Sequence, residues 1–188
     1  MKIGIIGCSG RMGKGLIEEI VFNENTTLTG GVVKHNSDFV GLDLGAIANI
    51  DAIGINASSN IENLIKESDA VIDFTTPELT LKCALLAASN NTTHVIGTTG
   101  LTEEDQKILA KHAKKTPIIW SANMSVGVNV LNALVERTAS ILGNDYDIEI
   151  LEMHHCHKVD APSGTALQLG EAAAKGRNIA LNDVACKS

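Results

Sequence analysis

Short apolar runs alternate with segments of helical periodicity over the first two thirds of this chain. Continuous apolar runs bounded by glycine or polar residues predict buried β-strands. Segments whose apolar residues recur every three or four positions predict amphipathic helices. The predicted strands are 2–6, 27–33, 52–56, 70–74, 94–96 and 117–120. The predicted helices are 11–22, one that begins at 76–78 with Thr76 as N-cap, and one from 102 to about 115.

This alternation of strand and helix predicts an α/β fold, a Rossmann-like doubly wound parallel sheet with helices on both faces. The pattern then changes to a long helix at 126–142, an alternating strand at 147–153 and a small-residue helix at 163–175. We therefore place a domain boundary near Asn123. A dinucleotide-binding domain is expected at 1–122, and a partial α+β substrate-binding and oligomerisation domain at 123–188.

A glycine-rich loop follows the first predicted strand and opens the first predicted helix, with the sequence GCSGRMG at residues 7–13. The spacing G-x-x-G-x-x-G is a variant of the dinucleotide-binding fingerprint. Glycines let the loop turn tightly, so that backbone N–H groups and the positive end of the helix can bind a pyrophosphate. A glycine-rich turn without a ligand is the alternative. The residues expected to contact the cofactor are Gly7, Cys8, Ser9, Gly10, Arg11 and Met12.

The end of the second predicted strand indicates which dinucleotide is preferred. NAD-binding folds commonly carry Asp or Glu there to accept the ribose 2′-hydroxyl. This chain has no acid at that point and carries Lys34, with Arg11 available from the glycine loop. Two cations suit the 2′-phosphate of NADPH, so we expect NADPH, with NADH as the alternative cofactor. A solvated loop lysine is the competing interpretation of Lys34.

Two later strand ends are rich in small polar residues, DFTTP at 73–77 and GTTG at 97–100. Ligands bind at the carboxyl ends of strands in open parallel sheets. Hydroxyl groups and bare backbone at these ends suit a ribose, phosphates and a nicotinamide amide. A further polar stretch at 121–129 leads into the second domain. The same residue types also form turns and helix caps, and both interpretations stay open.

Residues 152–166 contain three of the six histidines and carry the densest candidate chemistry. Imidazole can donate or accept a proton near neutral pH, and a neighbouring lysine supplies charge for an anionic substrate. Ser163 starts a predicted helix whose free N–H groups could bind a carboxylate. Zinc binding is a second interpretation, but side chains alternate in an extended segment and Lys158 adds a cation beside these ligands. A solvated His-rich loop is the third.

Composition excludes some classes of protein. The 22 acidic and 15 basic residues give a net charge of −7, which argues against a nucleic-acid partner because phosphate backbones select basic surfaces. The apolar start at 1–7 is too short for a signal peptide, no later stretch reaches membrane length, and the four cysteines form no CxxC pair. We expect a cytoplasmic protein with free thiols, a small-molecule substrate, and no membrane or metal partner.

Five motifs occur in order along the chain: GCSGRMG, DFT, GTTG, NMSVGVN at 123–129 and HHCHKVDAPSGT at 154–165. Together they resemble those of the bacterial dihydrodipicolinate reductase family, also called 4-hydroxy-tetrahydrodipicolinate reductases. The resemblance extends to about Gly176, and the last motif is highly specific to that family. It implies cofactor contacts near the reactive end at Gly97, Thr98, Thr99, Ser121, Ala122, Asn123 and Met124.

The resemblance also implies roles for the histidine segment. His154 is the expected proton donor or acceptor, and Lys158 a second proton donor. His155, Gly164 and Thr165 are expected to bind the substrate's carboxylates. The implied reaction is the NAD(P)H-dependent reduction of 4-hydroxy-tetrahydrodipicolinate to tetrahydrodipicolinate in lysine and diaminopimelate biosynthesis. Hydride comes from nicotinamide C4, and negative charge that builds on the substrate ring is quenched by a nearby acid.

Several features depart from the family pattern. Val33, followed by Lys34, stands where some members carry an acidic residue, and Cys156 stands where some carry a basic one. Family chains continue past the position of Ser188, so the predicted strand at 147–153 would lack sheet partners, and the homotetramer that members form through that sheet becomes doubtful. A truncated, catalytically impaired NADP(H)-binding fragment is the alternative function, and a zinc-dependent hydrolase is the third.

Overall fold

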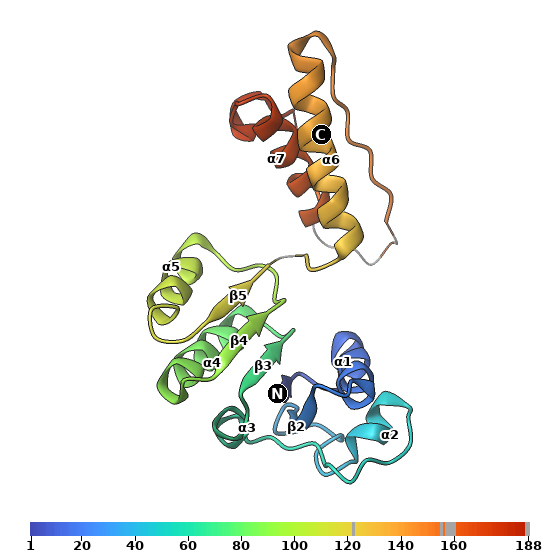
Figure 1. Ribbon diagram of the computed structural model, residues 1–188, viewed down its shortest axis with the longest axis vertical. Helices are drawn as coiled ribbons and strands as arrows, with labels where there is room; N and C mark the ends of the chain where they lie inside the picture. The colour runs from blue at the N-terminus through green and yellow to red at the C-terminus, as the bar shows by residue number, and fades with distance from the viewer. Residues whose placement is uncertain (122, 155, 157–160, 187–188) are drawn as a thin grey trace. The chain divides into compact units, whose positions relative to one another are not determined.

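The computed structural model describes residues 1–121, 123–154, 156 and 161–186. The chain divides into two compact units, Met1–Ser121 and Ala122–Ser188. The first unit contains the sheet and the second unit contains helices (Figure 1). No helix in the described part of the chain combines the length and the apolar character that crossing a bilayer requires.

The first unit is built on a five-stranded parallel sheet in the order β2-β1-β3-β4-β5 (Figure 1). Continuous apolar strands of this kind are typical of sheets that are covered on both faces. The predicted α/β class is therefore confirmed. The strands are β1 (Lys2–Ile6), β2 (Thr27–Val32), β3 (Ala70–Asp73), β4 (Thr93–Ile96) and β5 (Ile118–Trp120).

Helices cover both faces of the sheet. Successive side chains of each strand point to opposite faces, so both faces carry apolar side chains that helices bury. Ile5 of β1 packs with Ile17 of α1 in one core, and Ile6 packs with Leu64 and Cys83 of α3 and α4 in the other. The helices of this unit are α1 (Arg11–Phe22), α2 (Leu44–Ala48), α3 (Ile61–Glu67), α4 (Pro77–Asn90) and α5 (Glu103–His112).

The helix starts follow the predicted caps with one difference. Thr102 and Asp105 form a reciprocal capping box at the start of α5, as the sequence suggests. Thr76 occupies the N-cap position of α4, but its side chain makes no capping hydrogen bond. Pro77 sets the first turn of α4, because its fixed φ suits this position and the N–H it lacks would have no helical partner there.

The strand predicted at 52–56 is wrong. Asn56 forms only an isolated bridge to Asp43, and α2 and α3, which the periodicity does not predict, flank the segment. The Asp43 carboxylate accepts hydrogen bonds from the backbone N–H groups of Ile53 (3.1 Å) and Gly54 (2.7 Å). These bonds lower the pKa of Asp43, the bond from Ile53 most. The Asp43 side chain thus takes hydrogen bonds from backbone N–H groups that a neighbouring strand would otherwise accept.

The second unit is helical in its described part. Its elements are α6 (Val126–Leu142), a 3-10 turn (Gly143–Asp145), α7 (Gly164–Gly176) and α8 (Leu181–Val184), the last not predicted. α6 and α7 pack closely, since a Cβ on Gly176 would lie 2.3 Å from the Glu136 carbonyl oxygen, and Lys175 forms an ion pair with Glu136 at 3.0 Å. The predicted helices at 126–142 and 163–175 are confirmed.

The strand predicted at 147–153 is wrong as well. The segment is extended but belongs to no strand in the described part of the unit. A strand exists only where a neighbour pairs its backbone, and the described neighbours here are helices. Its apolar side chains consequently stay accessible, with Leu151 90% and Met153 88% exposed.

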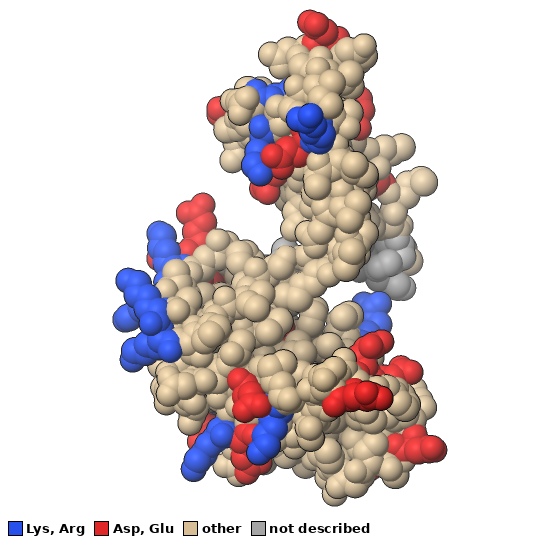
Figure 2. Space-filling view, in the orientation of Figure 1, with Lys and Arg blue, Asp and Glu red and all other residues tan. Residues whose placement is uncertain are grey.

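Charged side chains of both signs are spread over the visible surface of the first unit (Figure 2). Lys and Arg side chains gather over α5, where Lys107, Lys111, Lys114 and Lys115 are all exposed. The chain as a whole is acidic despite these lysines, with a net charge of −7.

Candidate functional site

A hollow of about 250 Å³ opens at the carboxyl edge of the sheet. The chain leaves β1 toward β2 on one side and leaves β3 toward β4 on the other, so the strand order reverses between β1 and β3. Crevices at such switch points are where open α/β sheets bind ligands. The hollow is lined by Gly10, Arg11, Met12, Gly13, Phe74, Thr75, Gly97, Thr98 and Thr99.

The glycine loop is shaped by two close approaches that only glycine allows. Gly7 has φ +81°, and a Cβ there would lie 2.8 Å from Cγ2 of Thr75. A Cβ on Gly13 would lie 2.4 Å from the Gly7 carbonyl oxygen, so α1 packs directly on the loop. The N–H groups of Gly7 and Cys8 both donate to the Val32 carbonyl oxygen, at 2.8 and 3.1 Å. This anchoring leaves the N-terminus of α1, with its free N–H groups, facing the hollow.

Four other predicted cofactor residues of the first unit are not among the residues that line the hollow: Gly7, Cys8, Ser9 and Lys34. The Cys8 side chain is buried under β2, where a Cβ on Gly31 would lie 2.7 Å from Cys8 Sγ. Burial raises the pKa of the Cys8 thiol to about 11 and keeps the side chain away from solvent. Lys34 is exposed just past β2, and Ser9 is half-buried in the loop.

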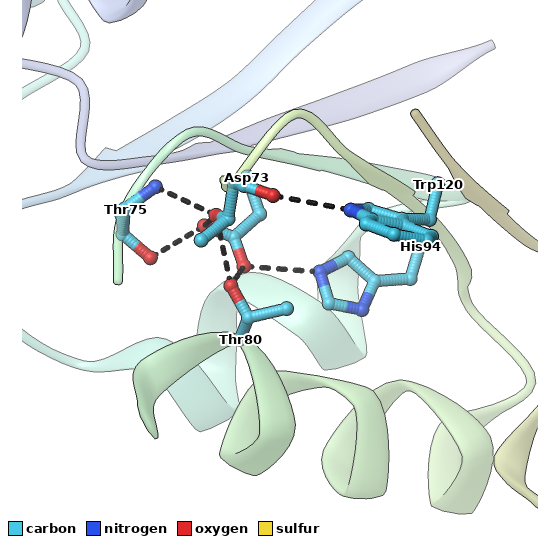
Figure 3. A network of polar contacts seen from close by, with 6 residues as sticks. Asp73, Thr75, Thr80, His94 and Trp120 are labelled. Carbon is cyan, nitrogen blue, oxygen red and sulfur yellow. Dashed lines mark hydrogen bonds and ion pairs between the residues drawn. The ribbon is translucent and has the colours of Figure 1, made fainter. Parts of the chain in front are cut away.

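A buried carboxylate organises the two polar strand ends (Figure 3). Asp73, at the end of β3, is fully buried. Its oxygens accept hydrogen bonds from the hydroxyls of Thr75 (2.5 Å) and Thr80 (2.7 Å). Nε2 of buried His94 lies 3.3 Å from Asp73 Oδ2. The buried carboxylate is thus surrounded by polar partners from the segment after β3, from α4 and from β4, as a buried polar group requires.

The same network fixes Thr98, which lines the hollow. The Thr98 hydroxyl accepts from the Thr75 N–H at 3.0 Å and lies 2.9 Å from the Thr80 hydroxyl. The Thr98 carbonyl oxygen accepts from Nε1 of Trp120 at 3.1 Å (Figure 3). Beside it, a Cβ on Gly97 would lie 2.0 Å from the Phe74 ring. Contacts from β5, from α4 and from the segment after β3 therefore fix the conformation of the loop that follows β4.

Sequence reasoning identifies DFTTP and GTTG as segments but does not find the partners that hold them. The motifs assign no role to Thr80, His94 and Trp120. These residues lie in a predicted helix and two predicted strands, where side chains are expected to serve packing. One signal was available, because Asp73 and His94 are charged or titratable residues inside short apolar strands. Such residues are almost never fully buried unless they are paired.

In the second unit, Glu152 joins His154 to the start of α7. Nε2 of His154 lies 2.8 Å from Glu152 Oε2. The Ser163 backbone N–H donates to Glu152 Oε1 at 2.8 Å, and the Ser163 hydroxyl donates to Glu152 Oε2. Hydrogen bonds from the Ser163 side chain and then from His154 lower the pKa of Glu152 to about 2. The carboxylate therefore stays ionised at neutral pH.

α7 begins where the sequence predicts a helix start. Ser163 is the N-cap, and its hydroxyl accepts from the Ala166 N–H at 3.1 Å. Gly164 is exposed and Thr165 is half-buried in the first turn.

The remaining predicted site residues fall into two groups, those that the structure describes and those that it does not. The Ser121 N–H donates to the Ile96 carbonyl oxygen at the end of β5, and the Asn123 side chain accepts from the Ser125 N–H. Met124 is 38% exposed. Three residues with predicted roles lie outside the described residues: Ala122, His155 and Lys158. Among residues that are described, no group of three His, Cys, Asp or Glu could bind a metal ion, and His157 is also not described.

Two family models match the chain and together cover almost all of it. The model described as the N-terminus of dihydrodipicolinate reductase matches residues 1–124, and the one described as its C-terminus matches 127–186. The chain is 48% identical over 188 residues to the 4-hydroxy-tetrahydrodipicolinate reductase of Parvibaculum lavamentivorans and spans 69% of that protein's length. It is 50% identical over 187 residues to the reductase of that name from Rhizobium rhizogenes, of which it spans 67%.

A solved structure of a dipicolinate-bound dihydrodipicolinate reductase from Paenisporosarcina sp. TG-14 superposes with a TM-score of 0.70 and is 31% identical. The similarity covers 94% of this chain and 66% of that one. Family models, sequence relatives and structure therefore agree over both units. This chain belongs to the dihydrodipicolinate reductase family.

Proposed function

We propose that the chain catalyses the NAD(P)H-dependent reduction of 4-hydroxy-tetrahydrodipicolinate to tetrahydrodipicolinate, a step of lysine and diaminopimelate biosynthesis. The observation that carries the proposal is the family match over both parts of the chain, residues 1–124 and 127–186. The match includes the glycine loop at the sheet edge as well as the histidine segment, so the residues for cofactor and for substrate chemistry are both present.

The hollow of the first unit suits a nicotinamide dinucleotide. Its floor is bare backbone at Gly10 and Gly97, and the N-terminus of α1 offers N–H donors to a pyrophosphate. Thr75, Thr98 and Thr99 also line the hollow and add polar side chains to it. When bound, the reduced nicotinamide supplies a hydride to the conjugated ring of the substrate.

NADPH is the proposed cofactor, with NADH as the weaker alternative. Arg11 lines the hollow, and Lys34 is exposed just past the end of β2. The described residues immediately after β2, Val33 to His35, include no acid that would accept a ribose 2′-hydroxyl. Positive charge at this strand end favours a 2′-phosphate instead.

The second unit is assigned the substrate chemistry. His154 is proposed to deliver the proton that neutralises the reduced ring, with Lys158 as a second proton donor. Gly164 and Thr165 are proposed to bind a substrate carboxylate through the first-turn N–H groups of α7, together with His155. The substrate is thereby a small dicarboxylate, in keeping with the dipicolinate bound by the related reductase from Paenisporosarcina sp. TG-14.

The test uses the purified 188-residue chain. Oxidation of NADPH is followed by absorbance with enzymatically generated 4-hydroxy-tetrahydrodipicolinate, and NADPH binding is measured separately by fluorescence titration. We expect both binding and substrate-dependent oxidation. Binding without oxidation would establish the catalytically impaired fragment in place of the reductase, and no binding would overturn the cofactor site. Metal analysis of the same sample with stoichiometric zinc would favour a hydrolase.

A further inference from the structure

One carboxylate in the second unit connects the two groups to which the proposed function assigns chemistry. Glu152 Oε2 is bonded to the His154 ring, and Glu152 Oε1 accepts from the backbone N–H of Ser163, the N-cap of α7. Glu152 and Ser163 are separated by 11 residues in the chain, so the contact is tertiary. A substitution of Glu152 would therefore remove contacts both to the His154 ring and to the start of α7.

The contact continues from Glu152 into α7. The Ser163 hydroxyl donates to Glu152 Oε2 and accepts from the Ala166 N–H at 3.1 Å. Ser163 is 3% exposed, so this hydroxyl has little access to water as an alternative partner. The helix start, the hydroxyl, the carboxylate and the imidazole therefore form one hydrogen-bonded series, and groups in such a series orient one another.

We propose that Glu152 is a positioning residue that sets the orientation and the tautomer of His154 relative to the first turn of α7. The proposal rests on the proposed function, in which His154 delivers a proton and Gly164 and Thr165 bind a carboxylate. An ionised carboxylate accepts hydrogen bonds only, so a ring bonded to it through Nε2 carries its proton there. Nδ1 is then the nitrogen available to the substrate. The ring delivers a proton from Nδ1 as the imidazolium and returns to the neutral form that keeps its proton on Nε2.

The ionisation state of Glu152 supports this role. Its pKa is lowered to about 2, so the acceptor character persists throughout the pH range in which a reductase would work. The Ser163 hydroxyl occupies the same oxygen as the imidazole, which prevents the carboxylate from turning away. The neighbouring Glu149 is exposed and offers a carboxylate on the same extended segment for comparison.

The experiment compares Glu152→Gln with Glu149→Gln in the full chain. Gln keeps one acceptor for the Ser163 N–H and replaces the oxygen that accepts from His154 with a donor. We expect kcat to fall by roughly 10- to 100-fold in Glu152→Gln, because a small misplacement of a reacting group has effects of that size. Glu152→Gln should keep the wild-type dissociation constant for NADPH. Glu149→Gln should keep the wild-type kcat.

A double-variant comparison separates positioning from simple stability. If Glu152 acts through His154, Glu152→Gln should lower kcat no further in a His154→Gln background. Equal kcat in the two single glutamate variants, or losses that multiply in the double variant, would overturn the proposal. An inactive wild-type chain would instead refute the proposed function.

A measurement on the wild-type chain guards against a variant that fails to fold. Heteronuclear NMR of the imidazole nitrogens, at a pH where the ring is neutral, should show the proton of His154 on Nε2. A proton on Nδ1 would contradict the positioning role, whatever the variants do.

Discussion

At the scale of single residues, the site depends on side chains that compensate one another. Asp73 and His94 are both fully buried, and each would be costly alone. Together with three threonine hydroxyls they form a polar centre inside apolar strands (Figure 3). Of these residues only Thr75 and Thr98 line the hollow, so the buried pair affects the hollow through the two loops that carry them.

Asp73→Asn should weaken both the fold and cofactor binding. The substitution removes the buried charge and turns one acceptor into a donor that faces the Thr80 hydroxyl and His94. We expect the free energy of unfolding to fall by about 2 kcal/mol in urea denaturation. NADPH affinity should fall by roughly tenfold because Thr98 loses its support. The exposed Asp38→Asn should change neither quantity, and an Asp73→Asn chain with wild-type NADPH affinity would show that the network does not shape the hollow.

Lys34→Glu should move the cofactor preference toward NADH. An acidic side chain past β2 accepts the ribose 2′-hydroxyl and repels a 2′-phosphate. The ratio of NADPH to NADH affinity should drop by roughly 10- to 100-fold in fluorescence titrations at low salt. Lys66→Glu on α3 makes the same charge change at another exposed site and serves as the control. A ratio that changes equally in both variants would assign the preference to net charge rather than to Lys34.

At the scale of elements, the proposed cofactor and carboxylate contacts lie at the starts of two helices. α1 begins at the glycine loop and α7 begins at Ser163, and each is placed by contacts outside the helix itself. For α1 the contact is steric, since Gly13 rests on the loop backbone. For α7 it is electrostatic, through Glu152.

Two glycines in α1 offer a matched comparison. A Cβ on Gly13 would lie 2.6 Å from the Cα of Cys8, whereas a Cβ on Gly15 meets nothing within 4 Å. Gly13→Ala should therefore lower the free energy of unfolding by about 1–3 kcal/mol through overpacking, and should also weaken NADPH binding. Gly15→Ala should raise the free energy of unfolding by about 0.5–1 kcal/mol, because alanine favours helix. Similar effects in calorimetry of the two variants would contradict this packing of α1.

The depressed pKa of Glu152 predicts a pH dependence of stability. Its value in the fold is about 2, against 4.5 for the unperturbed group, so the folded state binds this proton less readily than the unfolded state. The stabilisation is fully present above about pH 4.5 and is lost as the pH falls toward 2. Urea denaturation of wild type and Glu152→Gln across this window should show a difference that shrinks as the pH drops. A constant difference would mean that Glu152 has an ordinary pKa.

At the scale of the whole molecule, the chain forms two compact units, and the residues proposed for cofactor binding and for substrate chemistry are divided between them. The hollow is lined entirely by residues of the first unit, and the histidine segment belongs to the second. The visible face of the second unit is largely uncharged (Figure 2), and apolar side chains of α6 such as Val126 and Leu134 are 78% and 58% exposed.

This division predicts that catalysis and cofactor binding can be separated by mutation. His154→Ala should lower turnover by roughly two to four orders of magnitude, because a positioned proton donor is lost. Its NADPH dissociation constant should equal that of the wild type, since no residue of the hollow is changed. Steady-state kinetics and titration on the same preparation test both parts. Unchanged turnover would remove His154 from the mechanism.

The α/β alternation, the glycine loop and the family could all be read from the amino-acid order, because each depends on local periodicity or on a motif at fixed spacing. The same reasoning failed at 52–56 and 147–153, where strand-like patterns have no paired strand beside them in the part of the chain that the structure describes. The meeting of Asp73 with His94 and of Glu152 with Ser163 became visible only in the folded chain. These pairs join residues distant in the chain, and a hydrogen bond between such residues leaves no local pattern in the sequence.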